Sequence, residues 1–140
     1  MPILFFKEKI KFRFTMQENI RHWIKKMIKK EGAALSNINF IFCSDSYLRK
    51  INKEYLKHDY FTDIITFDNS NSKKQVDGDI FISIDRININ SKIYNASFND
   101  ELQRVIAHGV LHLLGYEDKN SADKKIMRKR EDFWLKERNF

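Results

Sequence analysis

Apolar and polar residues follow one another along the chain in two distinct periods, which predict strands and helices in turn. Strict alternation over residues 10–14 predicts a half-buried strand. Apolar residues spaced three and four apart over residues 16–28 predict the helix that follows, with Thr15 as its cap and Gly32 as its end. A mostly apolar run over residues 38–43 predicts the next strand.

The middle of the chain predicts a helix followed by a hairpin. Ser44 or Asp45 begins the helix, since both residue types favour the position before the first helical turn. Residues 63–67 and 79–84 are rich in β-branched and aromatic side chains and flank the polar stretch 68–75. They therefore predict two strands joined by a polar loop.

Three more helices are predicted in the second half of the chain. A short one covers residues 86–94. A strongly apolar one runs over residues 102–113, with Asn99 as its cap and Gly115 as its end. Ser121 begins the last one.

These interleaved elements predict a single compact α+β domain over residues 1–140, with a mixed sheet of roughly four strands and about five helices. Hydrophobic residues make up 42% of the chain and charged residues 32%, which favours one core and disfavours intrinsic disorder. The single Cys43 excludes an intramolecular disulfide framework and a multi-cysteine metal site. The sequence shows neither the roughly 18 consecutive apolar residues of a membrane span nor a signal-peptide core. We therefore expect a cytoplasmic protein.

Residues 108–118, with the sequence HGVLHLLGYED, carry the candidate chemistry. His108 and His112 lie four apart at the end of a predicted helix, so their side chains share one face and are able to chelate a divalent metal. Gly115 lets the chain leave the helix and turn back, which brings Asp118 to the same point. This is the spacing of metzincin-type zinc sites. In this chain the third ligand would be a carboxylate. Three protein ligands leave a fourth position open, so we predict one catalytic Zn²⁺ per chain.

Two features of this segment leave alternatives open. A histidine pair four apart on an apolar helix is also typical of core residues with ordinary hydrogen-bond partners. In zinc peptidases the residue after the first histidine is Glu, the general base, whereas this chain has Gly109, which cannot move a proton. Glu117, next to Asp118, is therefore a candidate catalytic base, and an exposed loop carboxylate is the alternative.

The same segment resembles the H-G-x-L-H-L-x-G-Y-[DE]-x signature of the YbeY family of rRNA maturation factors. Upstream and in the same order, residues 48–55 resemble that family's L-R-x-L-N-x-x-Y helix, residues 62–67 its T-D-V-L-S-F strand and residues 78–82 its G-D-I-x-I strand. The resemblance implies an α+β fold and a zinc-dependent endoribonuclease specific for single strands. It implies a role in 16S rRNA 3′-end maturation and small-subunit quality control. The implied partners are ribosomal RNA, the small ribosomal subunit and ribosome-assembly proteins, with neither DNA nor a membrane.

Two positions depart from the pattern of that family. Its commonest third ligand is His, whereas this chain has Asp118, which is also a competent zinc ligand. The family usually has an Arg linked to RNA cleavage directly after the Tyr of the first motif, and here that position is Leu56. Lys57 and His58 are the nearest substitutes, because either can contact phosphate and His58 can also transfer protons. An exposed turn is the alternative for both.

The formal net charge of +7 permits a polyanionic partner. An equal excess, nine Lys and Arg against two Glu, lies between Lys7 and Lys30. The first predicted helix carries four of these cations on its polar side: Lys25, Lys26, Lys29 and Lys30. We expect this group to hold an RNA backbone without reading its sequence, and a solvated surface is the alternative.

Three functions therefore stay open at the level of sequence. The first is a zinc-dependent endoribonuclease for rRNA, in which Asp63 and Thr66 line the cleft. The second is a metal-dependent hydrolase of another ester or peptide bond, which Gly109 disfavours for peptides. The third is a non-catalytic ribosome-assembly factor, which Leu56 favours because an apolar side chain cannot bind phosphate.

Overall fold

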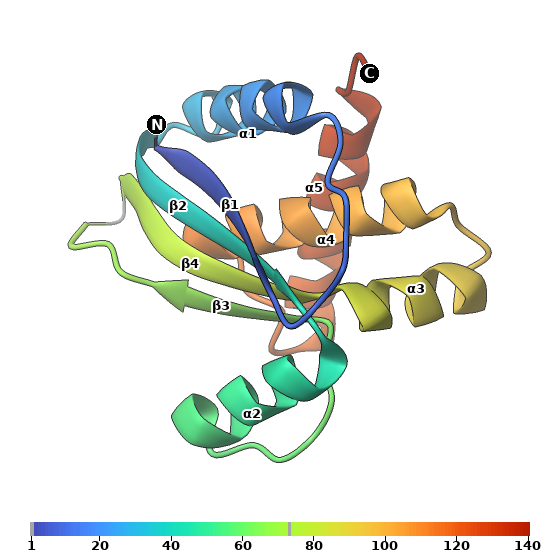
Figure 1. The fold of residues 1–140 in the computed structure, drawn as a ribbon. Helices are drawn as coiled ribbons and strands as arrows, with labels where there is room; N and C mark the ends of the chain where they lie inside the picture. The colour runs from blue at the N-terminus through green and yellow to red at the C-terminus, as the bar shows by residue number, and fades with distance from the viewer. Residues whose placement is uncertain (1, 73) are drawn as a thin grey trace.

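The computed structural model describes residues 2–72 and 74–140, in which one sheet is surrounded by helices (Figure 1). The four strands are β1 (Ile3–Glu8), β2 (Ala34–Cys43), β3 (Ile64–Asp68) and β4 (Gln75–Ser83). The five helices are α1 (Gln17–Lys30), α2 (Asp45–Leu56), α3 (Ile84–Ile93), α4 (Phe98–Leu113) and α5 (Ser121–Lys136). The predicted single compact α+β domain with a mixed four-stranded sheet is confirmed.

The strands lie in the order β1-β2-β4-β3. β1 and β4 both run parallel to the central β2, whereas β3 forms the edge and runs antiparallel to β4. The predicted hairpin between the third and fourth strands is therefore confirmed. This arrangement leaves β3, which carries Thr66, at the edge of the sheet nearest to α4.

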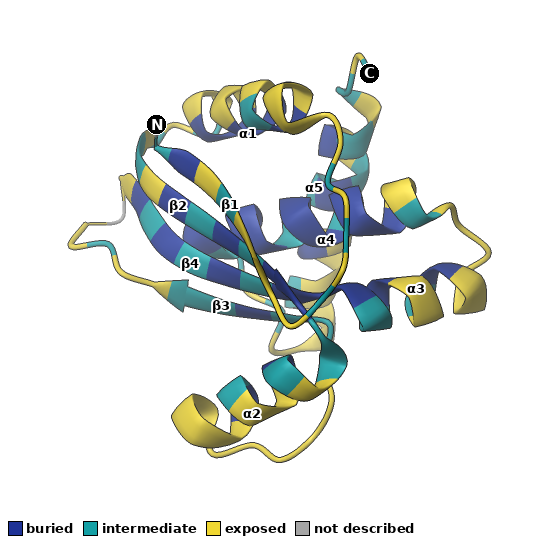
Figure 2. Ribbon diagram, viewed as in Figure 1, coloured by how far each residue is buried: buried dark blue, intermediate teal, exposed yellow. Residues whose placement is uncertain are grey.

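Alternate residues of the sheet are buried in two unequal clusters, as their period of two requires (Figure 2). Phe40 of β2 and Ile80 of β4 belong to the main core, together with the apolar faces of α1, α4 and α5. On the other side, Leu48 of α2 packs with Ile65 and Cys43 in the smaller cluster. The larger cluster fixes α4, the helix that carries both candidate histidines.

Helix α4 lies directly on the sheet at Gly109. A Cβ atom added there would lie 2.9 Å from Cδ1 of Ile64 and 3.1 Å from Ile80. Any side chain at position 109 would therefore point into the sheet. Glycine allows the close approach that sets the depth of the whole helix.

The structure overturns the prediction of a strand over residues 10–14. The first strand is β1, and the left-handed Lys9, with φ +56°, turns the chain away after it. Because β1 already pairs with the free edge of β2, the segment that follows has no ladder partner there. Its alternating residues still cover the core, with the ring centroid of Phe14 4.8 Å from that of Phe42. The alternation therefore indicated which side chains of this segment face the core, and not that the segment belongs to the sheet.

Two predicted helix caps are also wrong. Met16, in the left-handed conformation with φ +64°, precedes α1 in place of Thr15. Ser97 caps α4 in place of Asn99, because its hydroxyl accepts a hydrogen bond from the backbone N–H of Asp100 at 3.0 Å. Helix α3 begins at Ile84, two residues before its predicted start, and β2 and β4 each begin four residues before theirs. The two predicted stop glycines, Gly32 and Gly115, follow their helices with positive φ. In the part of the chain that the structure describes, no helix combines the length and apolarity needed to cross a membrane.

Candidate metal centre

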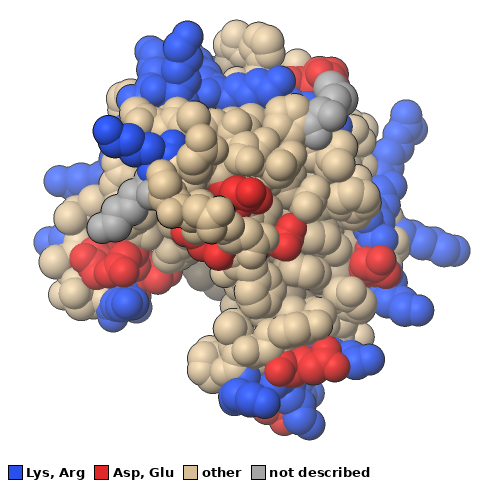
Figure 3. Space-filling view, turned by 90° about the vertical axis from the view of Figure 1, so that its left-hand side faces the viewer, with Lys and Arg blue, Asp and Glu red and all other residues tan. Residues whose placement is uncertain are grey.

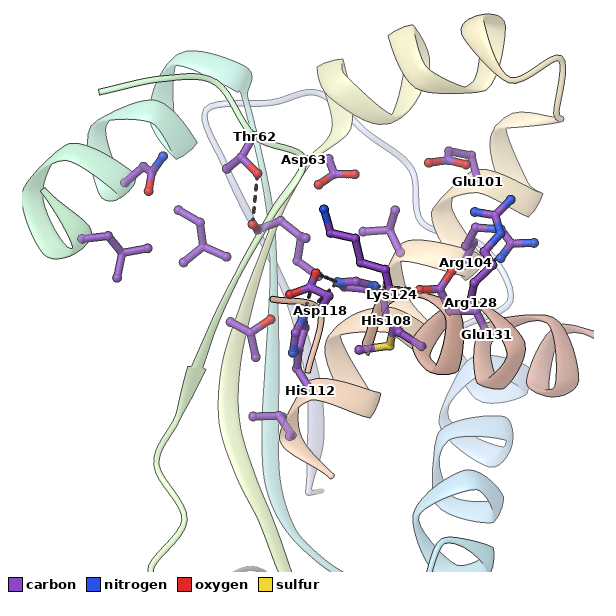
Figure 4. Close-up of a pocket in the computed structure, with 18 of the residues that line it drawn as sticks. Thr62, Asp63, Glu101, Arg104, His108, His112, Asp118, Lys124, Arg128 and Glu131 are labelled. Carbon is purple, nitrogen blue, oxygen red and sulfur yellow. Dashed lines mark hydrogen bonds and ion pairs between the residues drawn. The ribbon is translucent and has the colours of Figure 1, made fainter. Parts of the chain in front are cut away.

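The candidate ligands come from the end of α4 and the loop that follows it. His108 and His112 occupy successive turns of α4 and point to the same side of the helix (Figure 4). Gly115, with φ +105°, reverses the chain directly after the helix. The loop then returns Asp118 to the two imidazoles before α5 begins. The local geometry predicted from the sequence is the geometry observed.

Three ligand atoms converge at this point. The Nε2 atoms of His108 and His112 lie 3.0 Å apart, and Oδ2 of Asp118 lies 3.3 Å from the first and 3.5 Å from the second. Ligand atoms about 2.0–2.1 Å from a tetrahedral zinc ion lie roughly 3.3 Å from one another. The spacing and the nitrogen and oxygen donors therefore fit one ion of the size of zinc.

Glu131 of α5 contacts His108 at the ring nitrogen that does not belong to the ligand cluster. Its Oε2 lies 2.7 Å from Nδ1 of His108, while its Oε1 accepts a hydrogen bond from Arg104 at 3.0 Å. An imidazole that donates Nδ1–H to a carboxylate leaves its Nε2 lone pair free for a metal. Glu131 therefore selects the tautomer and the ring orientation of His108 that metal binding needs.

The surroundings shift the pKa values of three ionisable groups of the site in different directions. Burial disfavours the charged form of His108, but the contact with Glu131 outweighs it and raises the pKa of this imidazole. Burial and the neighbouring His108 both lower the pKa of His112. Burial raises the pKa of Asp63, and the nearby His108 opposes that rise.

Replacing Glu131 by Gln is expected to weaken metal binding by about 10–100-fold, because outer-shell partners of ligating histidines carry that much affinity. Gln has nearly the same shape but cannot stabilise the His108 ring in the same way. Competition titration against a metal chelator measures the change. Asp132→Asn is the matched control, since Asp132 contacts Arg104 at 2.7 Å but not His108. Equal affinities for both variants would contradict the role given to Glu131.

The three ligands lie at the wall of a cavity of about 750 Å³. One side is formed by α2 and the segment after it, the other by α4 and α5, and β3 contributes the floor. Carboxylates on these walls are Asp63, Asp68, Glu101, Asp118 and Glu131, and the basic residues are Arg104, Lys124 and Arg128. A cavity of this volume has room for part of a polymer chain next to the metal ligands.

The structure brings some of the other candidate residues to this cavity. Asp63 and Thr66 line it, and so does His58. The His58 ring stacks on Tyr60 with centroids 5.3 Å apart, and Nδ1 of His58 lies 3.1 Å from the Tyr60 hydroxyl. Leu56 lines the cavity as well, so its apolar side chain does face the place where a substrate would lie.

Other candidate residues lie elsewhere. Lys57 ends α2 in the left-handed conformation and is absent from the described residues that line the cavity. Glu117 also lies outside that lining and pairs with Lys119, whose Nζ is 3.5 Å from its Oε1. The four lysines of α1 form part of the basic surface at the top of Figure 3, on a helix that contributes nothing to the described lining. The predicted docking surface is therefore separate from the candidate metal centre.

Comparison with known proteins settles the family. The family model described as Endoribonuclease YbeY matches residues 3–139. The chain belongs to this family. A YbeY endoribonuclease of Cytophaga hutchinsonii is 49% identical over 138 residues, covering 99% of this chain and 96% of that protein. One of Karelsulcia muelleri is 50% identical over 125 residues, covering 89% and 88%.

The fold is shared with an experimentally solved protein. The solution structure of TM1509 from Thermotoga maritima matches with a TM-score of 0.72 and 26% sequence identity, over 96% of this chain and 87% of that one. Members of the YbeY family are endoribonucleases, which are hydrolases that act on RNA. The His108, His112 and Asp118 cluster is consistent with a metal-dependent member of that family.

Gly109 separates this site from the usual zinc-peptidase arrangement. The position that carries the peptidase base is the one at which α4 touches Ile64 and Ile80. A Glu there would point into the sheet and away from the cavity. This chain thus has peptidase-like ligand spacing without a carboxylate base at position 109.

The sequence alone did not assign four residues to the site: Arg104, Lys124, Arg128 and Glu131. Glu131 did leave a signal, because it occupies the buried face of α5 with Met127 and Trp134. A carboxylate in an apolar helix face requires a partner, since an unpaired buried charge is costly. That partner is the histidine–arginine pair on α4.

Proposed function

We propose that the protein is a zinc-dependent endoribonuclease that cleaves single-stranded RNA, acting in the cytoplasm in 16S rRNA 3′-end maturation and in quality control of small ribosomal subunits. The proposal includes residues 1–140 as one catalytic domain, with ribosomal RNA, the small subunit and ribosome-assembly proteins as partners. The observation that carries it is the convergence of His108, His112 and Asp118 at a cavity wall, in a chain of an endoribonuclease family.

The chain's own residues account for substrate placement at this site. His108, His112 and Asp118 would hold the zinc ion, which supplies Lewis-acid stabilisation of negative charge on phosphate oxygens when bound. Glu131 keeps His108 oriented throughout. Asp63 is the candidate for transferring a proton to or from an RNA oxygen, because it lines the cavity and burial raises the pKa of its carboxyl.

Exposed aromatic rings support the preference for single strands. Tyr60 and Tyr94 line the same cavity and are 54% and 65% exposed. Unpaired bases stack on such rings, whereas bases inside a duplex are already stacked on each other. Farther away, Lys25, Lys26, Lys29 and Lys30 on α1 would contact the backbone of a long ribosomal RNA rather than the nucleotides being cleaved.

One comparison tests the proposed function. Zinc-loaded protein is incubated with a single-stranded RNA carrying the 16S 3′ end and its extension, with the same RNA annealed to its complement, with DNA of that sequence, and with casein. We expect cleavage of the single-stranded RNA alone, lost on chelation and restored by zinc. Casein cleavage would support the peptide hydrolase, and RNA binding without cleavage would support the non-catalytic assembly factor. His112→Ala protein purified in parallel controls for contaminating nuclease.

A further inference from the structure

The cavity presents an electrostatic problem to the proposed substrate. Every nucleotide of RNA brings one negative charge, and five carboxylates line the cavity. A single metal ion held by Asp118 offsets only part of this charge. RNA phosphates therefore need cationic side chains close to the metal centre.

Among the described residues, three Lys or Arg side chains line the cavity, and they are not equivalent. The Arg104 guanidinium is already paired, with Glu131 at 3.0 Å and Asp132 at 2.7 Å. Among the residues that the structure describes, no carboxylate lies within 4.0 Å of the Lys124 amine or the Arg128 guanidinium. These two cations are exposed and available to an anion that enters the cavity.

Lys124 and Arg128 lie four apart on α5, so they share one face of the helix. Figure 4 shows the Lys124 side chain extending into the cavity on the side of Asp63, with Arg128 beside Arg104. The same face carries Glu131, which contacts His108. One rigid helix therefore fixes the position of both cations relative to the metal ligands.

We propose that Lys124 and Arg128 form a phosphate-binding subsite that holds the RNA backbone next to the metal centre. The inference rests on the proposed function, since it names the residues that position that substrate. It also answers the question raised by Leu56, because the cationic contact comes from α5 on the opposite wall of the cavity. The two residues bind and position RNA, and they do not take part in proton transfer.

The same helix supplies a matched control. Lys125 and Lys129 are also exposed and also lie four apart, but they are absent from the described residues lining the cavity. The double variants Lys124→Gln with Arg128→Gln, and Lys125→Gln with Lys129→Gln, remove the same charge from the same helix. Only the first removes it from the cavity wall.

The experiment measures binding of a fluorescent 2′-O-methyl oligouridylate to zinc-loaded full-length protein at a series of salt concentrations. A gel confirms that the strand is intact afterwards. Each phosphate contact on a single strand adds about 0.7 to the slope of log affinity against log salt. We expect the Lys124/Arg128 variant to lose about 1.4 from that slope, and the Lys125/Lys129 variant to keep the wild-type value. Lys124→Arg with Arg128→Lys, which retains both charges, should restore it.

Cleavage of unmodified single-stranded RNA by the same proteins separates this proposal from the proposed function. A slope loss confined to the Lys124/Arg128 variant supports the subsite, even if wild-type protein cleaves no RNA, in which case only the proposed function fails. Equal slopes in the two double variants would overturn the subsite, whether both fall or neither does. In that case, wild-type cleavage of RNA would leave the proposed function standing.

Discussion

Replacing His112 by Ala is expected to remove the metal and abolish RNA cleavage. A zinc ion held by a full set of protein ligands contributes roughly 10–16 kcal/mol, so one ligand of a small set carries several kcal/mol. We therefore expect metal affinity to fall by at least about 100-fold. Among the described residues, only His108, His112 and Asp118 form a cluster able to hold a metal ion, so no further ligand of the cluster takes the place of the lost imidazole. Elemental analysis after dialysis and a cleavage assay on single-stranded RNA measure the two losses.

Two further variants sharpen this result. His22→Ala removes an exposed histidine of α1 outside the cavity lining and should change neither metal content nor cleavage. Asp118→His replaces the third ligand by another that zinc accepts and should retain the metal. Full metal content and full activity in the His112→Ala protein would show that the chemistry lies elsewhere in the chain.

The metal ligands could be predicted from the sequence because their geometry is local. A helical spacing of four places His108 above His112, and a glycine at position 115 allows the turn that returns Asp118. Neither relation depends on how distant elements pack. The paired strands after α2 were predictable for a similar reason, since a short polar loop joins them.

The other parts of the site depend on how α5 packs across α4. Glu131 lies 23 positions after His108, and only the packed helices bring their side chains together. In the sequence, Lys124 and Arg128 look like the other charged residues of a basic helix. Only the structure shows that these two line the cavity and that Lys125 does not. Lys57 shows the converse, because its neighbours Leu56 and His58 line the cavity, whereas Lys57, in the left-handed conformation at the end of α2, does not.

Glu31 joins three parts of the molecule at the end of α1. Its carboxylate accepts hydrogen bonds from the Tyr116 hydroxyl at 2.7 Å, from Nε1 of Trp134 at 2.8 Å and from the Arg130 guanidinium. Tyr116 lies two residues before Asp118, while the other two partners belong to α5. Glu31 therefore ties α1 to the metal-binding loop and to the helix that orients His108.

Replacing Glu31 by Ala is expected to lower the free energy of unfolding by about 3 kcal/mol at neutral pH. The Glu31 side chain is only 10% exposed, and its removal leaves Arg130 and two neutral donors without their acceptor. Urea unfolding followed by circular dichroism measures the change. Glu18→Ala is the control, because Glu18 pairs with Arg21 in an ion pair whose acid is 75% exposed, and such pairs contribute about 1 kcal/mol at most.

The difference between wild type and the Glu31→Ala protein should depend on pH with a definite sign. Burial disfavours the charged carboxylate, but the hydrogen bonds from Arg130, Tyr116 and Trp134 outweigh it and lower the pKa of Glu31. A group whose pKa is lower in the folded state stabilises the fold above its unfolded pKa and loses that contribution as pH falls through the folded value. The stability difference should therefore be full at neutral pH and shrink in acid, below the ordinary pKa of a glutamate. A difference that stays constant into acid would show that Glu31 acts through packing, and not through its charge.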